Sequence, residues 1–417
     1  MLGFNAGQPT SGSYDVKELF AELRVPVLSD GLLLELNGAA RYSDYSLEEV
    51  GGVWTYTGGA IFAPIPDVRF RGQYARAVRA PNVQDLFGGN NTGFPAAIDP
   101  CSDRGSAASR TEALRALCIA SGVPAANVFT RLVQPATQIQ TDFGGNPNVS
   151  EEVSDTYTAG VVVQPRFVPR LSITADYFNI RVEDTIGTFG GGLSNALGLC
   201  FNTVQDLSAP ICSVFAGTRG PTGAIGQTAG GSNPQILSAN TGLLETSGFD
   251  FQVDYNMPLF NTARVSFFYL GTLLDKYRNT TIASIPEREL IGEGTFGLPK
   301  YRHTARVTVS DGPALVSLRW RFEGETQSSR IENVFAGLER TGTDPALIAR
   351  PYLGSINYFD LTLGYDVNEN FSLNVGVNNL LDEQPPVLGT DAEQANTLPS
   401  YFDVLGRDFF VSARLKF

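Results

Sequence analysis

The chain has 417 residues, of which 42% are hydrophobic, 11% aromatic and 18% charged, and its formal net charge is -13 at pH 7. This acidic balance argues against nucleic acid as a partner, because phosphate binding requires clustered Lys and Arg. The mean hydropathy is -0.04, and no stretch approaches the roughly 18 uninterrupted apolar residues of a membrane-spanning helix. A soluble all-β protein and a membrane β-barrel both fit, since a barrel spreads its apolar residues over every second position.

Alternation of apolar and polar residues is the dominant pattern along the chain. Residues 249–257 and 359–367 show it most clearly, with an apolar residue at every odd position. A period of two indicates strands with one apolar and one polar face. Most such segments are at least as long as the roughly 9–11 residues that cross a bilayer at a tilt. We expect thirteen strands, near residues 14–28, 32–46, 53–65, 68–80, 152–165, 171–184, 245–257, 262–276, 301–310, 314–325, 355–367, 370–381 and 408–417.

The lengths of the connections separate the two remaining classes. Short turns, such as residues 310–313 and 367–370, alternate with long connections over residues 81–150, 188–240, 278–300, 326–352 and 382–406. The turn at residues 48–52 is the one exception, because it is short where the alternation calls for a long connection. A soluble sandwich prefers shorter strands at a spacing of about 8–12 residues. The pattern therefore favours an all-β, antiparallel transmembrane β-barrel with short periplasmic turns and long extracellular loops.

The four cysteines form two local pairs, Cys101 with Cys118 and Cys200 with Cys212, in irregular segments. We expect two disulfides and therefore an oxidising compartment. Loops of this length gain roughly 3 kcal/mol from closure on the chain-entropy model. A metal site is the weaker alternative, because the spacings are not C-x-x-C and the single histidine, His303, is distant. Residues 106–120 predict a short helix that the first disulfide would staple.

Residues 76–87 carry the most specific motif. They resemble the signature F-R-A-P-s-l-x-E-L-F, which leads from a barrel strand into an extracellular loop in TonB-dependent receptors. The matching residues are Arg79, Ala80, Pro81, Asp85, Leu86 and Phe87, with Asp85 in place of the usual Glu. Residues 148–160, 246–251 and 375–385 resemble three further signatures of the family in the family's order, although Pro385 stands where a Tyr is usual.

This resemblance implies that residues 1–417 form part of one barrel domain, with about thirteen C-terminal strands of a 22-stranded, plugged barrel. We expect the plug domain and the TonB box to be absent, and the signal peptide too, because the first residues have no basic or apolar region. The implied location is the outer membrane of a Gram-negative bacterium. The implied partners are outer-membrane lipid, the barrel-assembly machinery and, through the missing plug, the TonB–ExbB–ExbD complex. Phe417 closes an amphipathic segment that resembles the signal read by that machinery.

The resemblance also implies active uptake of a scarce solute, such as a siderophore–iron complex, cobalamin or an oligosaccharide. Loops this long are usually functional or disordered. We expect them to contact a small-molecule or oligosaccharide ligand through Asn90, Asn91, Phe94, Arg131, Gln138 and Asp142. A passive porin and an extracellular β-rich binding module are the alternatives. We expect no catalytic residue and no cofactor, because a single histidine makes histidine-based catalysis improbable and the Gly-rich runs lack the P-loop Lys.

Overall fold

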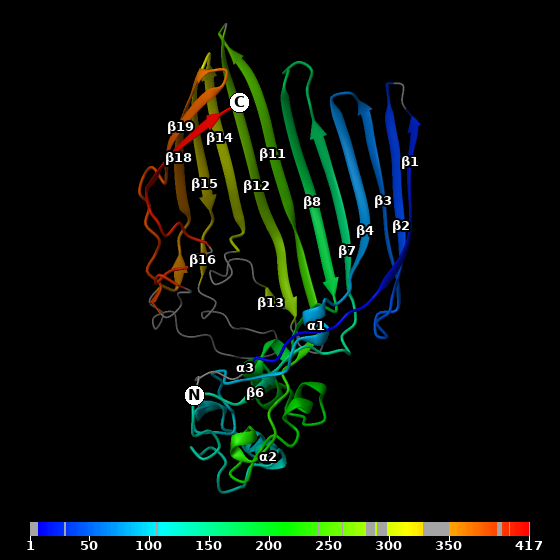
Figure 1. Cartoon of the computed structure of the whole chain (residues 1–417), viewed down its shortest axis with the longest axis vertical. Coiled ribbons are helices and arrows are strands. Elements are labelled where there is room, and N and C mark those ends of the chain that lie inside the picture. Colours follow the sequence, from blue (N-terminus) through cyan, green and yellow to red (C-terminus); the bar gives the residue numbers. More distant parts are fainter. Residues whose placement is uncertain are drawn as a thin grey trace.

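The computed structural model describes residues 7–28, 31–105, 107–240, 242–260, 262–280, 288–289, 298–327, 350–389, 394–399 and 401–416. Thirteen long strands in these ranges form one antiparallel sheet, in which each strand pairs with the next long strand along the chain. The sheet runs from β1 to β20 and is not closed (Figure 1). The strands are β1 (Val16–Leu28), β2 (Leu33–Tyr45), β3 (Gly52–Ile65), β4 (Val68–Arg79), β7 (Glu152–Val163), β8 (Leu171–Glu183), β11 (Leu243–Leu259), β12 (Ala263–Thr280), β14 (Tyr301–Asp311), β15 (Ala314–Glu323), β18 (Ile356–Asn368), β19 (Phe371–Asn378) and β20 (Asp408–Leu415). Each overlaps a segment predicted from the alternation, so the antiparallel all-β prediction is confirmed.

The register keeps the alternation in phase from strand to strand. Val307, Leu318 and Leu361 pair across β14, β15 and β18 and lie on one face. Thr308, Ser317 and Thr362 pair one position along and lie on the other. A slip of one residue would move every apolar side chain to the polar face, so the pattern itself specifies the register.

Strand ends differ from the prediction where pairing or a turn decides them. β11 and β12 extend further than predicted, because their ladder continues from Leu259↔Ala263 to Leu243↔Thr280. β19 stops at Asn378, since Asn379 has a φ of 49° and its N–H donates to Asp360 at 2.9 Å. The predicted helix begins at Glu112, because the Thr111 side chain caps it by accepting from the Leu114 N–H.

Aromatic side chains gather on the apolar face where the strands meet the long connections. His303 lies among Tyr269, Tyr301, Trp320 and Phe322, with ring centroids 4.3–5.5 Å from its own. His303 thus shares the apolar face with Val307 and Leu318. Outer-membrane barrels carry aromatic girdles of this kind at the edges of the bilayer. Among the described residues, none of the helices has the length and apolarity needed to cross a membrane.

Two long connections, residues 81–151 and 184–240, gather at one end of the sheet, where the short turn between β2 and β3 also lies, and the other short turns lie at the opposite end (Figure 1). We call these two segments the cap. The cap contains α1 (Val83–Phe87), α2 (Glu112–Ala120) and α3 (Leu193–Gly198), the paired strands β5 (Asn91–Gly93) and β6 (Thr141–Phe143), and the paired strands β9 (Ile186–Thr188) and β10 (Ser238–Asn240). Its shorter helical turns are η1 (Ala107–Ser109), η2 (Phe189–Gly191), η3 (Leu199–Val204), η4 (Pro210–Phe215) and η5 (Gln227–Ala229). Elsewhere β13 (Arg288–Glu289) pairs with β12, and β16 (Thr326–Gln327) with β17 (Tyr352–Leu353).

A pair of substitutions on adjacent residues of β11 tests which face contacts lipid. Val253 lies on the apolar face opposite Tyr269, and Gln252 points to the polar face. We expect Val253→Arg to lower the free energy of unfolding in a bilayer by roughly 2–4 kcal/mol, because it places a cation in lipid. Gln252→Arg should change it by no more than about 0.5 kcal/mol. Urea unfolding followed by tryptophan fluorescence measures both, and equal losses would contradict the assignment of the faces.

Candidate functional site: the cap

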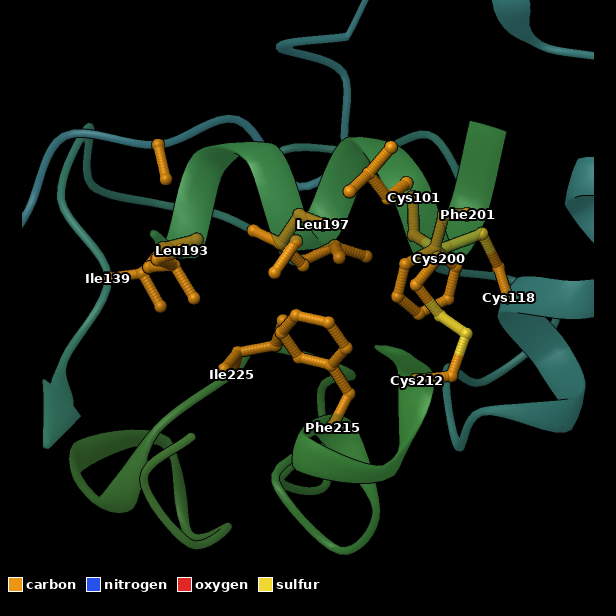
Figure 2. Close-up of a cluster of buried hydrophobic side chains, with 14 of the residues drawn as sticks. Cys101, Cys118, Ile139, Leu193, Leu197, Cys200, Phe201, Cys212, Phe215 and Ile225 are labelled. Carbon is orange, nitrogen blue, oxygen red and sulfur yellow. A yellow bond between two sulfur atoms is a disulfide. The ribbon is translucent and has the colours of Figure 1, made fainter. Parts of the chain in front are cut away.

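A hydrophobic core shared by both long connections holds the cap together (Figure 2). The first connection contributes Ala97, Cys101, Leu114, Cys118, Val123, Val128, Val133 and Ile139. The second contributes Leu193, Ala196, Leu197, Leu199, Cys200, Phe201, Ile211, Cys212, Phe215, Ile225 and Ile236. The two segments therefore fold as one unit, in contrast to independent surface loops.

Both predicted disulfides are present within this core. Cys101 bonds Cys118 and Cys200 bonds Cys212, with sequence separations of 17 and 12 residues. Each bridge closes a loop inside one connection, which on the chain-entropy model stabilises the folded cap by roughly 3 kcal/mol. Inside the second loop, Asp206 accepts hydrogen bonds from the N–H and O–H of Ser208. These bonds to the charged form hold the pKa of the Asp206 carboxyl below its ordinary value.

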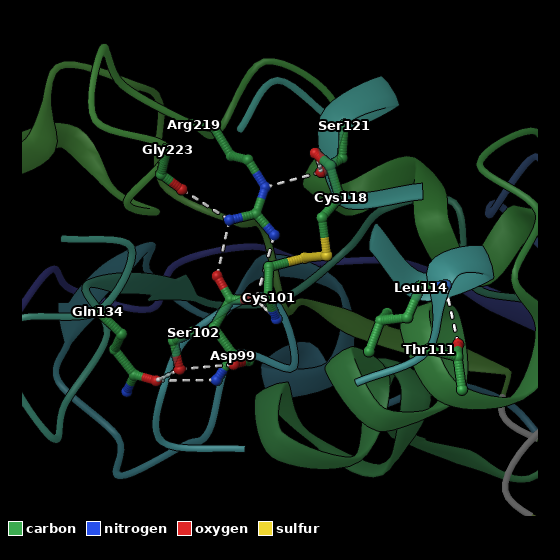
Figure 3. Close-up of a disulfide and its surroundings, with 10 residues drawn as sticks. All are labelled: Asp99, Cys101, Ser102, Thr111, Leu114, Cys118, Ser121, Gln134, Arg219 and Gly223. Atoms are coloured by element: carbon green, nitrogen blue, oxygen red, sulfur yellow. Dashed lines mark hydrogen bonds and ion pairs between the residues drawn. A yellow bond between two sulfur atoms is a disulfide. The ribbon is translucent and has the colours of Figure 1, made fainter. Parts of the chain in front are cut away.

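A buried ion pair joins the two connections (Figure 3). The Arg219 guanidinium donates to both carboxylate oxygens of Asp99, at 2.7 and 3.2 Å, and the two side chains are only 2% and 1% exposed. Arg219 also donates to Ser121 Oγ at 2.9 Å and to the Gly223 carbonyl at 2.7 Å. Asp99 accepts in addition from the Cys101 N–H at 2.9 Å. Buried charges are tolerated when they are paired and hydrogen-bonded in this way.

The signature residues fix the point where the chain leaves the sheet for the cap. Pro81 has no N–H and cannot extend the β4 ladder, which ends at Arg79. The Arg79 guanidinium donates to both Glu152 oxygens of β7, at 2.5 and 2.7 Å, and to Asp85 at 3.3 Å. Glu152 accepts as well from the Ile186 N–H at 2.6 Å, where the second connection begins. The signature thus ties together the ends of β4 and β7 and the base of both connections.

The remaining signature residues lie on or beside α1. Asn82 and Asp85 form a reciprocal capping box, and Leu86 is buried. Phe87 packs against the backbone of Gly12, where a Cβ would lie 2.0 Å from the ring, so only glycine fits. The Gln8 N–H donates to Asn91 Oδ1 at 2.6 Å. Residues 7–12 therefore lie along the base of the cap.

The structure places five of the six predicted ligand contacts on two neighbouring segments. Asn91 and Asp142 belong to the pair β5–β6, Asn90 and Phe94 flank β5, and Gln138 bridges Ala96. Arg131 lies apart from them, 4.0 Å from Asp103.

Hydrogen bonds within the cap separate these candidates into two kinds. Asp142 accepts from the side chains of Thr92, Asn233 and Gln235, at 2.7–2.8 Å, and so joins the two connections. Both polar ends of the Asn91 side chain are likewise used, by Gln8 and Gly89. Asn90, Phe94, Arg131 and Gln138 are exposed on the cap surface, and the Asn90 side-chain amide also donates to Gln235 at 3.5 Å.

Sequence reasoning missed the Arg219–Asp99 pair and the contact of residues 7–12 with α1. Asp99 and Arg219 are 120 residues apart and belong to no motif, so nothing local indicated them. Within the described ranges, no group of three or more His, Cys, Asp or Glu side chains is placed to hold a metal ion.

Comparison with known proteins gives one family match and many structural ones. The family model described as "TonB dependent receptor-like, beta-barrel" matches residues 3–380. A mutant of the ferric enterobactin receptor PfeA of Pseudomonas aeruginosa aligns with a TM-score of 0.60 and 16% identity, over 98% of this chain and 46% of its own. The siderophore receptor PirA of Acinetobacter baumannii aligns with a TM-score of 0.58 and 16% identity, over 97% of this chain and 46% of its own.

These structural matches show the fold, because their sequence identity is low. This chain spans about half the length of the solved structures that it matches. No curated protein matches the sequence.

Replacing Arg219 with alanine tests whether the buried pair locks the cap. Asp99 would then be buried without a cation, which we expect to cost about 3–5 kcal/mol. Hydrogen exchange at the amides of Ala97, Val123 and Gly226 should become at least a hundredfold faster. The control Arg181→Ala removes a half-exposed ion pair with Glu183 and should leave these rates nearly unchanged. Unchanged exchange in Arg219→Ala would refute the proposed lock.

Proposed function

Because the chain belongs to the TonB-dependent receptor β-barrel family, we propose that it forms the wall and outer loops of a receptor for active uptake across the outer membrane of a Gram-negative bacterium. The apolar face would contact lipid, and the barrel-assembly machinery would insert the protein. The cap would bind a scarce solute outside the cell. Energy for its passage into the periplasm would come from the TonB–ExbB–ExbD complex.

The folded cap is the observation that carries this proposal. A connection between strands needs no core, no disulfide and no buried ion pair, whereas a surface that recognises a solute must hold its contacts in fixed positions. The cap has all three stabilising features and lies at the end of the sheet with the long connections. We propose that its exposed residues Phe94, Arg131 and Gln138 contact the solute.

The two alternatives receive less support. A passive porin does not depend on TonB, whereas the family to which this chain belongs is that of the TonB-dependent receptors. An extracellular module in water would have to cover the apolar face, on which Val307, Leu318 and Leu363 are each more than 40% exposed. Large exposed apolar patches mark contact with a partner or with lipid.

An iron–siderophore complex is the first solute to test, because the matched structures are named as ferric enterobactin and siderophore receptors. Cobalamin and oligosaccharides remain the next candidates.

Uptake of radiolabelled ferric enterobactin by cells that produce this chain as part of a receptor with a plug domain tests the proposal. We expect surface binding to persist and uptake to stop when an uncoupler collapses the proton gradient. Phe94→Ala and Arg131→Ala should each weaken binding about fivefold or more, as is usual for aromatic and arginine contacts at the centre of a binding surface. Arg166→Ala, in a short turn at the opposite end of the sheet, is the matched control and should bind like the wild type. Uptake that continues after uncoupling would contradict active transport and favour a porin.

A further inference from the structure

The polar face of the sheet contains a hollow of about 360 Å³. It lies over β14, β15, β18 and β19, and its lining includes Arg306, Thr308, Ser317, Arg319 and Asp360. Arg306 is at the middle of β14 (Tyr301–Asp311), between the cap end and the short-turn end. The hollow is therefore separate from the cap surface.

Its charges are unbalanced. Arg306 and Arg319 stand directly opposite each other in the register of β14 and β15. On its other side Arg306 pairs with Phe268 of β12, which brings no charge. Among the residues that the structure describes, no carboxylate lies within ion-pair distance of Arg306.

Asp360, the carboxylate in the lining of the hollow, is already engaged. It accepts from Arg319 Nε at 2.7 Å and from Arg321 at 3.0 and 3.2 Å. The Asn379 N–H donates to it as well, at 2.9 Å. Arg321 also lies 3.7 Å from Asp403, so Arg319 and Arg321 already share Asp360 and Asp403, and neither carboxylate pairs with Arg306.

Like charges directly opposite each other in a sheet are destabilising. An oxyanion between Arg306 and Arg319 would remove that repulsion, because guanidinium groups bind carboxylate and phosphate oxygens in a two-pronged geometry. The hydroxyls of Thr308 and Ser317, 2.9 Å apart, add donors on the same face.

We propose that this hollow binds a carboxylate or phosphate group of a small anionic solute on its way through the barrel. The inference rests on the proposed function, since it places the hollow on the path from the cap to the periplasm. It adds that the transported solute, or a form of it, carries an oxyanion.

The test uses citrate and inorganic phosphate as probes on the purified protein in detergent micelles, with erythritol as a neutral control. Calorimetry should show binding of at least one anion and none of erythritol. Arg306→Gln should weaken that binding at least tenfold. Arg306→Lys keeps the positive charge but cannot donate two parallel hydrogen bonds, and it should weaken binding less. Arg414→Gln is the matched control, because Arg414 lies on the polar face of β20 outside the hollow. It should bind like the wild type.

Unfolding curves separate a lost site from a lost fold. Without an anion, Arg306→Gln should be at least as stable as the wild type, because the repulsion with Arg319 is gone. With an anion, the wild type should gain stability through ligand linkage and Arg306→Gln should gain less. Preference for citrate identifies a carboxylate and preference for phosphate a phosphate, and either result supports the site.

Failure of this inference is distinct from failure of the proposed function. If the wild type binds neither anion, or if Arg306→Gln and Arg414→Gln weaken binding equally, the hollow is not an oxyanion site, whatever the uptake experiment shows. If uptake is independent of the proton gradient while Arg306→Gln still abolishes anion binding, active transport is refuted and the oxyanion site stands.

Discussion

Backbone hydrogen bonding between neighbouring long strands, in a single register, is the constraint on which the rest of the molecule depends. The register sorts side chains into an apolar face, with Val307 and Leu318, and a polar face, with Thr308 and Ser317. It also decides which residues meet within each face. Arg79 reaches Glu152, and Arg306 stands beside Arg319, because the ladders place them opposite each other. A one-residue slip would undo both pairs and reverse the two faces together.

The cap depends on a second kind of constraint, since it has few ladders of its own. Its two connections share an apolar core, and the buried Arg219–Asp99 pair joins them at a point remote from the sheet. Such a pair contributes little net stability compared with apolar residues of the same shape, but breaking it is costly. The free-energy cost of breaking the Arg219–Asp99 pair therefore opposes separation of the two connections. The exposed residues of the cap are therefore held in position by groups that no solute touches.

Features that depend on residues close together in the sequence could be predicted, whereas features that depend on residues far apart in the sequence could not. Alternation is local, so it predicted all thirteen long strands, and the short spacing within each cysteine pair predicted both disulfides. The ends of β11 and β19 depend on partners such as Thr280 and Asp360, which local pattern does not contain. Asp142 was predicted as a ligand contact from its polarity and position. The structure adds that its carboxylate joins the two connections, through donors that lie 50 to 93 residues away in the sequence.

The central claim is that the cap faces the outside of the cell and the short turns face the periplasm. Single cysteines introduced at exposed positions test it, because the described part of the chain has no free cysteine. Leu132 lies on the cap and is 54% exposed, and Phe167 lies in a short turn and is 86% exposed. A membrane-impermeant maleimide should label Leu132→Cys in intact cells, and Phe167→Cys only after the outer membrane is opened. Labelling of Phe167→Cys in intact cells, with Leu132→Cys protected, would contradict the account.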